Sequence, residues 1–153
     1  MSKEELGYEY FSEKGMMCSQ AVLAAFRKEC KLTEKDALML GSCFATGMNR
    51  GSVCGACTGA LMAIGIMFGQ QKMGDQQTRI NARSIADRFL KEFEKVNGSC
   101  ICNELLRVDV TTPEGVKYCK DNYLFKDFCP LMVMSACEIL DKIVKEELSK
   151  KEN

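Results

Sequence analysis

The segment from Gly51 to Gln71 carries no charged residue and limits most strongly how this chain can fold. Its apolar part, from Ala60 to Phe68, must leave water for either a lipid bilayer or a protein core. A membrane span needs about 20 predominantly apolar residues, whereas the first half of this segment holds small and polar residues such as Ser52, Gly55 and Thr58. We therefore predict a helix buried in a helical bundle and no membrane insertion.

Helical periodicity extends over almost the whole chain. Proline occurs only twice in 153 residues, and no segment alternates apolar and polar residues as a strand would. We therefore predict an all-α fold, a compact helical bundle of about six to eight helices around a buried Gly/Ala-rich central helix. No repeat or linker divides the chain, so residues 1–153 are expected to form a single cysteine-rich helical domain.

Capping residues and spacing give the expected order of helices. They are expected over about 3–14, 18–30, 33–44, 54–68, 76–96, 102–107, 113–122 and from 129 onward. In the long helix over 76–96, the residues expected to face inward are Ala82, Ile85, Ala86, Phe89, Phe93 and Val96. In the uncharged helix, Gly55, Gly59 and Ala63 form a small-residue face, which could pack inside the monomer or against a second subunit in a homodimer.

The charge balance excludes one class of function. The chain has 21 basic and 21 acidic residues, so it lacks the basic surface expected of a nucleic-acid-binding protein. The charged stretch Met1–Glu5 does not resemble a secretory signal, and a cytoplasmic location is expected. In a reducing compartment, cysteines more often bind metals or do redox chemistry than form permanent disulfides.

The chain has ten cysteines and no histidine. Without histidine there is no serine–histidine or cysteine–histidine catalysis, no histidine zinc site and no C-x-x-C-H haem attachment. Four thiolates could still hold an iron–sulfur cluster, zinc or Cu(I). Ten methionines would also suit copper, but several lie in apolar helices and are expected to fill the core; these are Met39, Met62, Met67, Met132 and Met134.

Four cysteines stand at predicted helix starts, namely Cys18, Cys54, Cys102 and Cys129. A helix N-terminus carries about half a positive charge and favours thiolate over thiol. If the bundle brings the four together, they would suit an anionic metal–sulfur cluster or a pair of redox-active thiols. Cysteine also packs often as a small hydrophobic residue, so position alone leaves both interpretations open.

The other cysteines have weaker signals. Cys54 and Cys57 form a C-x-x-C at a helix start, as in disulfide oxidoreductases, but no strand precedes it as in the thioredoxin fold. Cys100 and Cys102 form a C-x-C, which suits either a metal site or a spare loop cysteine. The remaining cysteines lie inside predicted helices and are expected to pack in the core; they are Cys30, Cys43, Cys119 and Cys137.

Several sequence elements resemble the C_GCAxxG_C_C family, whose small members are described as redox-active. The elements are Cys18-Ser19-Gln20-Ala21-Val22, Gly47-Met48-Asn49-Arg50-Gly51, Cys54-Gly55-Ala56-Cys57-Thr58-Gly59, Cys102-Asn103-Glu104-Leu105-Leu106 and Cys129-Pro130-Leu131. The resemblance covers about residues 5–145 and implies that the family's four cysteines correspond to Cys18, Cys54, Cys102 and Cys129. The family resemblance extends to the iron–sulfur module of split-Soret cytochromes. Because this chain lacks histidine and the haem-attachment motif, the resemblance does not imply a haem group here.

Three hypotheses follow for function. In the first, Cys18, Cys54, Cys102 and Cys129 bind an iron–sulfur cluster of unspecified type for electron transfer with a redox partner that the sequence does not name. In the second, the protein is a thiol–disulfide oxidoreductase that uses Cys54 as nucleophile and Cys57 as resolving thiol. In the third, the same thiolates bind zinc or Cu(I). The sequence leaves open whether the protein is an enzyme and whether it binds any cofactor.

Overall fold

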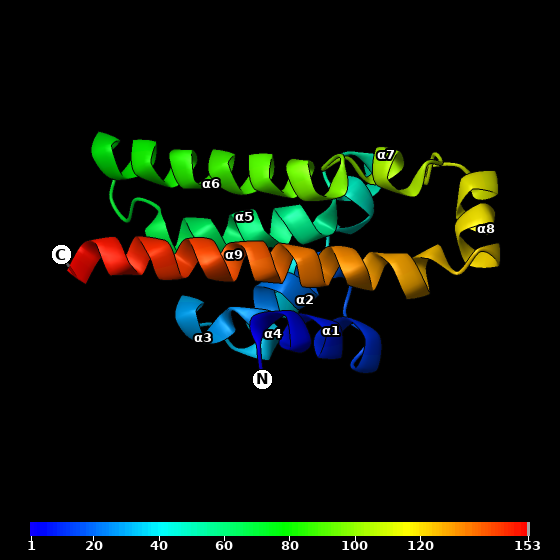
Figure 1. Ribbon diagram of the computed structural model, residues 1–153, viewed down its shortest axis with the longest axis horizontal. Coiled ribbons are helices and arrows are strands. Elements are labelled where there is room, and N and C mark those ends of the chain that lie inside the picture. Colours follow the sequence, from blue (N-terminus) through cyan, green and yellow to red (C-terminus); the bar gives the residue numbers. More distant parts are fainter. Residues whose placement is uncertain (153) are drawn as a thin grey trace.

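The computed structural model describes residues 1–152, which fold into α-helices and short π-helical segments joined by loops (Figure 1). The elements are α1 (Lys3–Tyr8), η1 (Glu9–Glu13), α2 (Cys18–Ala25), α3 (Arg27–Cys30), α4 (Glu34–Gly41), η2 (Gly47–Gly51), α5 (Gly55–Phe68), α6 (Gln76–Asn97), α7 (Cys102–Leu106), α8 (Pro113–Asp121), η3 (Leu124–Phe128) and α9 (Cys129–Glu152). Within these residues there is no β-strand, and the prediction of an all-α fold is confirmed.

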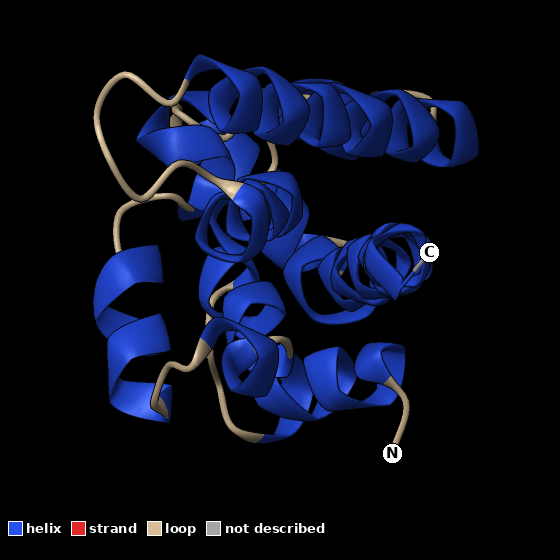
Figure 2. Cartoon of the chain, turned by 90° about the vertical axis from the view of Figure 1, so that its left-hand side faces the viewer, coloured by secondary structure: helices blue, strands red, loops and turns tan. Residues whose placement is uncertain are grey.

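The helices pack into a compact bundle. Helix α5 packs against α2, α6 and α9, while α1 packs against α9 and α4 against α2. In both views, α5 lies between the long helix α6 and the N-terminal helices α1–α4 (Figures 1 and 2). Within residues 1–152, no helix has the length and apolar composition needed to cross a membrane.

The small-residue face of α5 lets two helix backbones approach each other. A Cβ placed on Gly59 would lie 2.5 Å from the carbonyl oxygen of Ser19 in α2, and one on Gly55 would overlap the Cys18 Sγ. Ser19 is fully buried, and its hydroxyl donates to the Gly41 carbonyl at 2.7 Å. This bond holds the end of α4 against α2, beside the contact between α2 and α5. The Gly55/Gly59 face is therefore used inside the monomer, against α2.

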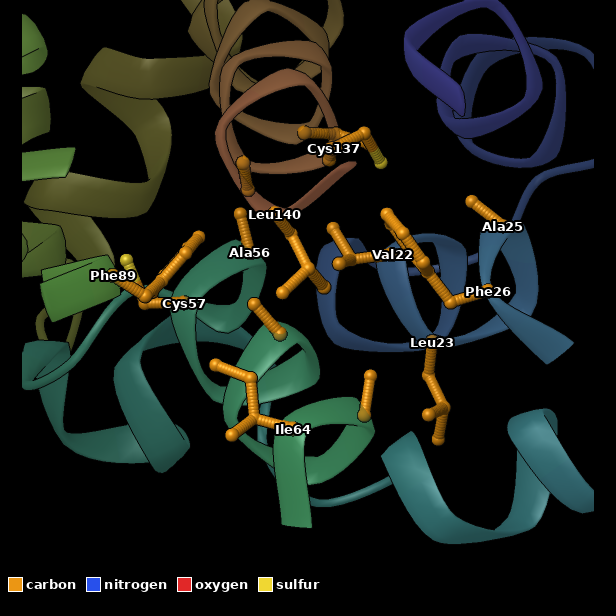
Figure 3. Packing of buried hydrophobic residues seen from close by; sticks show 14 of the residues in the cluster. Val22, Leu23, Ala25, Phe26, Ala56, Cys57, Ile64, Phe89, Cys137 and Leu140 are labelled. Carbon is orange, nitrogen blue, oxygen red and sulfur yellow. The ribbon is translucent and has the colours of Figure 1, made fainter. Parts of the chain in front are cut away.

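The core fills the space between α2, α5, α6 and α9. Fully buried side chains include Val22 from α2, Phe26 just after it, Ile64 from α5 and Leu140 from α9 (Figure 3). Phe89 and Phe93 of α6 are also fully buried, and their ring centroids lie 6.0 Å apart. Burial of each such side chain contributes about 1.5–3 kcal/mol.

Predicted helix ends agree well with the structure where a specific cap marks them. The Thr33 hydroxyl accepts from the Asp36 N–H at 3.1 Å, and the Asp36 carboxylate accepts from the Thr33 N–H at 2.9 Å. Thr112 caps α8 with Pro113 as its first residue. These local interactions fix where a helix begins and depend on neighbours within a few residues.

The structure corrects several predicted elements. There are nine α-helices in residues 1–152 rather than six to eight, partly because the expected helix over 18–30 breaks at Phe26 into α2 and α3. There the Lys3 ammonium group donates to the Ala25 carbonyl at 3.0 Å and takes over an acceptor at the end of α2. Val96 was expected inside but is 63% exposed, since it lines an open groove between α6 and α9.

Candidate functional site

A cavity of about 220 Å³ lies where α2, α5, α7 and α9 begin. The starts of α5, α7 and α9 lie at one end of the bundle, at the right of Figure 1. Four cysteines from these separate segments line the cavity, namely Cys18, Cys54, Cys102 and Cys129. The other lining residues carry no charge; they are Phe11, Met16, Met17, Ala45, Thr46, Gly55, Leu105, Leu106, Phe125, Phe128 and Met132. The structure thus brings together around one cavity the four cysteines selected from the sequence.

A short piece of antiparallel pairing joins Cys54 to Cys102. Val53 and Ile101 form an isolated β-bridge between the two loops that precede these cysteines. The Cys54 N–H donates to the Cys100 carbonyl at 2.8 Å, and the Cys102 N–H donates to the Ser52 carbonyl at 2.6 Å. Because this pairing fixes both backbones, the starts of α5 and α7 are held side by side.

Cys18 is the first residue of α2 and is enclosed by the backbones around it. The Gln20 side-chain oxygen accepts from the Met17 N–H at 2.9 Å and caps the helix start. The Cys18 sulfur accepts from the backbone N–H of Thr46 and lies against Gly55, where any side chain would collide with it. Glycine at position 55 therefore lets the start of α5 approach the Cys18 sulfur closely.

The loop between α4 and α5 has an unusual left-handed turn. Thr46, Gly47, Met48 and Asn49 all have positive φ, between 56° and 60°. A non-glycine residue in this conformation costs roughly 1–2 kcal/mol, and β-branched Thr46 is an outlier there. Such strain tends to cluster at functional sites. Here it turns the Thr46 N–H toward the Cys18 sulfur.

Cys129 differs from the other three in its backbone. Segment η3 runs into α9 without a gap, and the Cys129 N–H donates to the Leu124 carbonyl. The first turn of α9 is therefore not a free helix N-terminus, and the expected favourable helix end is missing at Cys129. By contrast, Cys18 and Cys102 are the first residues of α2 and α7, and Cys54 is the N-cap of α5.

The expectation that all four thiols have lowered pKa values is wrong for three of them. Burial, together with the neighbouring Cys54, raises the pKa of Cys18 to about 11 and that of Cys102 to about 12. Burial also raises the pKa of Cys129. Only the pKa of Cys54 is lowered, chiefly because the Cys57 thiol donates to its sulfur. In this apolar cavity, loss of hydration outweighs the helix ends at Cys18 and Cys102, and at Cys129 it acts where no free helix end is present.

Cys57 and Cys100 lie beside the cavity but are not among its lining residues. Cys57 is fully buried one turn into α5, next to Cys54. The Cys100 thiol donates to the Glu94 carboxylate at 3.1 Å, so the two cysteines of the C-x-C have different surroundings. Cys30, Cys119 and Cys137 are buried as predicted, whereas Cys43 is exposed because it follows the end of α4 on the outside of the bundle.

The cysteines of the described residues do not form a ready-made metal site. Within residues 1–152, no group of three or more His, Cys, Asp or Glu side chains is placed so that it could hold a metal ion. The four thiols of the cavity are instead distributed around its wall together with methionine and phenylalanine side chains.

The aromatic and methionine walls of the cavity were not predicted. Met132 lies in the core as expected and also lines the cavity, as do Phe125 and Phe128, which were not singled out. A usable signal was their position, since each lies within four residues of Cys129 in the sequence. Phe11 has no such signal, because only the packing of the bundle brings it to this end of the molecule.

Comparison with known proteins places the chain in a family. No curated protein and no solved structure gives a match. The family model described as "Putative redox-active protein (C_GCAxxG_C_C)" matches residues 16–143, which include all four cavity cysteines and most of the helical bundle. Because the match covers most of the chain and all four cavity cysteines, this chain belongs to the C_GCAxxG_C_C family.

Proposed function

We propose that the cavity holds an iron–sulfur cluster bound by Cys18, Cys54, Cys102 and Cys129, and that the protein transfers electrons. The observation that supports this proposal is that four cysteines, far apart in the sequence, line the same cavity of about 220 Å³. Four cysteine thiolates are the usual ligands of both [2Fe–2S] and [4Fe–4S] clusters. The cluster, when bound, would supply one-electron redox chemistry.

The dimensions of the cavity suit a group larger than a single atom. A cavity needs only about 10–15 Å³ on the same measure to hold one water molecule, and this one measures about 220 Å³. Gly55 leaves the space beside the Cys18 sulfur free of any side chain. The donor set and the shape of the wall therefore both fit a polynuclear group.

The residues around the sulfurs would adjust the properties of the bound group. Phe11, Phe125 and Phe128 make part of the wall apolar, which limits access of water. The Thr46 N–H donates to the Cys18 sulfur and the Ala56 N–H to the Cys54 sulfur. Hydrogen bonds to the sulfurs and low solvent exposure are two of the factors that set the reduction potential of such centres.

Anaerobic expression and reconstitution test this proposal. Iron and acid-labile sulfide would be measured together with visible absorption for the wild type and for single cysteine-to-serine variants. We expect bound iron in the wild type, its loss in Cys18→Ser, Cys54→Ser, Cys102→Ser and Cys129→Ser, and its retention in the control Cys43→Ser, which changes an exposed cysteine. A colourless, iron-free wild type would contradict the proposal. Stoichiometric zinc or copper in protein from its native host would favour soft-metal binding instead.

One observation favours a second function, thiol–disulfide exchange. Cys54 is the one cavity thiol whose pKa is lowered, and Cys57, three residues further along α5, would act as resolving thiol. A thiolate of this kind attacks a disulfide sulfur, and the second thiol then releases the mixed disulfide. Disulfide reductase activity that is lost in Cys54→Ser and retained in Cys30→Ser would support this function. Activity unchanged by Cys54→Ser would exclude it.

A further inference from the structure

The apolar side chains of the molecule form two separate cores. The main core lies between α2, α5, α6 and α9. A second, smaller core consists of the buried residues Cys102, Leu106, Val110 and Cys119. Every side chain in this second core or packed against it comes from residues 102–129, the part of the chain that contains α7, α8 and η3. One continuous segment therefore builds a core of its own beside the main one.

The cavity divides the four proposed ligands between the two cores. Cys54 is buried in the main core, and Cys18 packs against that core. Cys102 is buried in the second core, and Cys129 packs against it. Since all four cysteines line the cavity, the cavity lies at the boundary between the two cores.

The segment between the last two of these cysteines, residues 103–128, has a narrow joint to the main core; we call this segment the cover. Its central helix α8 packs chiefly against η3, within the cover itself, and stands at the outer end of the bundle (Figure 1). Leu105 and Phe128 are the side chains of the cover that pack against the main core. Both line the cavity and also a second pocket beside Asn97, at the end of α6. The joint is therefore bordered by open space rather than by further packing.

The cover is held together by its own interactions. The Asn103 side-chain oxygen accepts from the Val110 N–H at 2.9 Å, and its amide nitrogen donates to the Asp109 carboxylate at 3.3 Å. At the start of α8, the Thr112 hydroxyl accepts from the Gly115 N–H at 3.0 Å. Segments with internal bonds and few contacts to their surroundings open as cooperative units, at a lower free energy than unfolding of the whole chain.

We propose that the cover opens as a unit while the main core stays folded, and that this opening admits the metal–sulfur group to the cavity. The inference rests on the proposed function for the identity of that group. Cys102 and Cys129 flank the cover, so binding at both would fix its two ends to Cys18 and Cys54 at the main core. Because a ligand stabilises the state that binds it, we expect an opening cover in the metal-free protein and a closed one after reconstitution.

Hydrogen–deuterium exchange of the reduced, metal-free protein, followed by mass spectrometry, tests the opening. We expect amides in α8 to exchange at least about tenfold faster than amides in α5 and in the middle of α9. Exchange in α8 as slow as in α5 would overturn the inference, because the chain would then open only as a whole.

Two matched variants separate opening of the cover from general destabilisation. Val110 is buried in the second core, and Val133 is fully buried in the main core. Val133→Ala should speed exchange in α5 roughly tenfold and leave α8 unchanged, because Val133 stays buried when only the cover opens. Val110→Ala should speed exchange in both helices, because Val110 loses its packing in either event. Ile64→Val, a milder change in the main core, replaces Val133→Ala if that variant does not fold.

The reconstituted wild type completes the test. Its exchange in α8 should slow to the rate of α5. Equal acceleration of α8 in Val110→Ala and Val133→Ala would overturn the inference. Bound iron without slower exchange in α8 would also overturn it and leave the cluster proposal intact. A wild type without iron would overturn the proposed function, while exchange in the metal-free variants would still decide whether the cover opens by itself.

Discussion

Cys137 and Cys18 have the same side chain, and both lie on helices of the bundle, yet their surroundings differ. The Cys137 sulfur points toward α1, where a Cβ on Gly7 would lie only 2.7 Å from it (Figure 3). The Cys18 sulfur lies at the edge of a cavity of about 220 Å³. In the first region sulfur fills space, as any small apolar group would. In the second, space is left beside the sulfurs, and their chemistry is accessible to a ligand.

The difference teaches that burial alone does not identify a structural cysteine. Cys54 and Cys102 are each only 8% exposed, little more than Cys30 at 5%. What separates them is the neighbourhood, since the Cys30 thiol faces the Ala63 carbonyl, whereas the other two line the cavity. The predictions below test whether the two regions respond differently to the same kind of change.

The largest effect is expected from Gly7→Val in the packed region. The new side chain would collide with Cys137 Sγ and lie 3.0 Å or less from Val133 Cγ1, because α1 and α9 are in close contact. Overpacking of this kind should lower the free energy of unfolding by about 3 kcal/mol, as measured by urea denaturation. The double variant Gly7→Val/Cys137→Ala should recover part of the loss. A Gly7→Val protein as stable as wild type would show that this region is not tightly packed.

The next effect compares Cys137→Ser with Cys18→Ser in metal-free protein. A hydroxyl placed in the core at position 137 without a partner should cost about 2 kcal/mol of stability. Cys18 borders the cavity, and the same change there should cost less than about 0.5 kcal/mol. Thermal or urea unfolding under reducing conditions measures both. Equal losses would contradict the distinction between the two regions.

A smaller effect on stability, with a clear effect on binding, is expected for Gly55→Ala. The added methyl group would overlap the Cys18 sulfur and lie 3.1 Å from the Ala45 Cα. Alanine gains roughly 1 kcal/mol of helix propensity over glycine, which offsets part of the overlap. We expect a folded protein that binds less than half of the wild-type iron after reconstitution. Gly65→Ala on the same helix is the control, because a Cβ there has no neighbour within 4 Å, and it should bind iron normally.

The smallest effect is expected for Asp36→Asn, at the start of α4 and outside both regions. Hydrogen bonds from Thr33 hold the pKa of Asp36 below its ordinary value, so its charged form stabilises the fold. This stabilisation is present above the unfolded-state pKa and is lost as pH falls through the folded-state pKa. The melting temperature of Asp36→Asn should therefore lie slightly below wild type at pH 6 and match it at pH 2. A difference that persists at pH 2 would contradict this explanation.

Much of the fold was predictable because the signals are local. The caps at Thr33 and Thr112 and the apolar spacing of Ile85, Phe89 and Phe93 depend on neighbours within a few residues, and all appear as expected. The break at Phe26 was not predicted; it lies next to Ala25, whose carbonyl accepts from the Lys3 ammonium group, 22 residues away in the sequence. Neither was the exposure of Val96, which lines an open groove between α6 and α9.

The candidate site divides in the same way. The sequence by itself determined the number of cysteines and the absence of histidine, because these are properties of composition. It also selected Cys18, Cys54, Cys102 and Cys129, because the signals for helix starts lie in neighbouring residues. The tertiary structure decided that these four line one cavity, that Phe11 and Met132 help to enclose it, and that only Cys54 has a lowered pKa. Which groups share a cavity, and how far each is removed from water, depends on distances between segments remote in the chain, and only packing sets those distances.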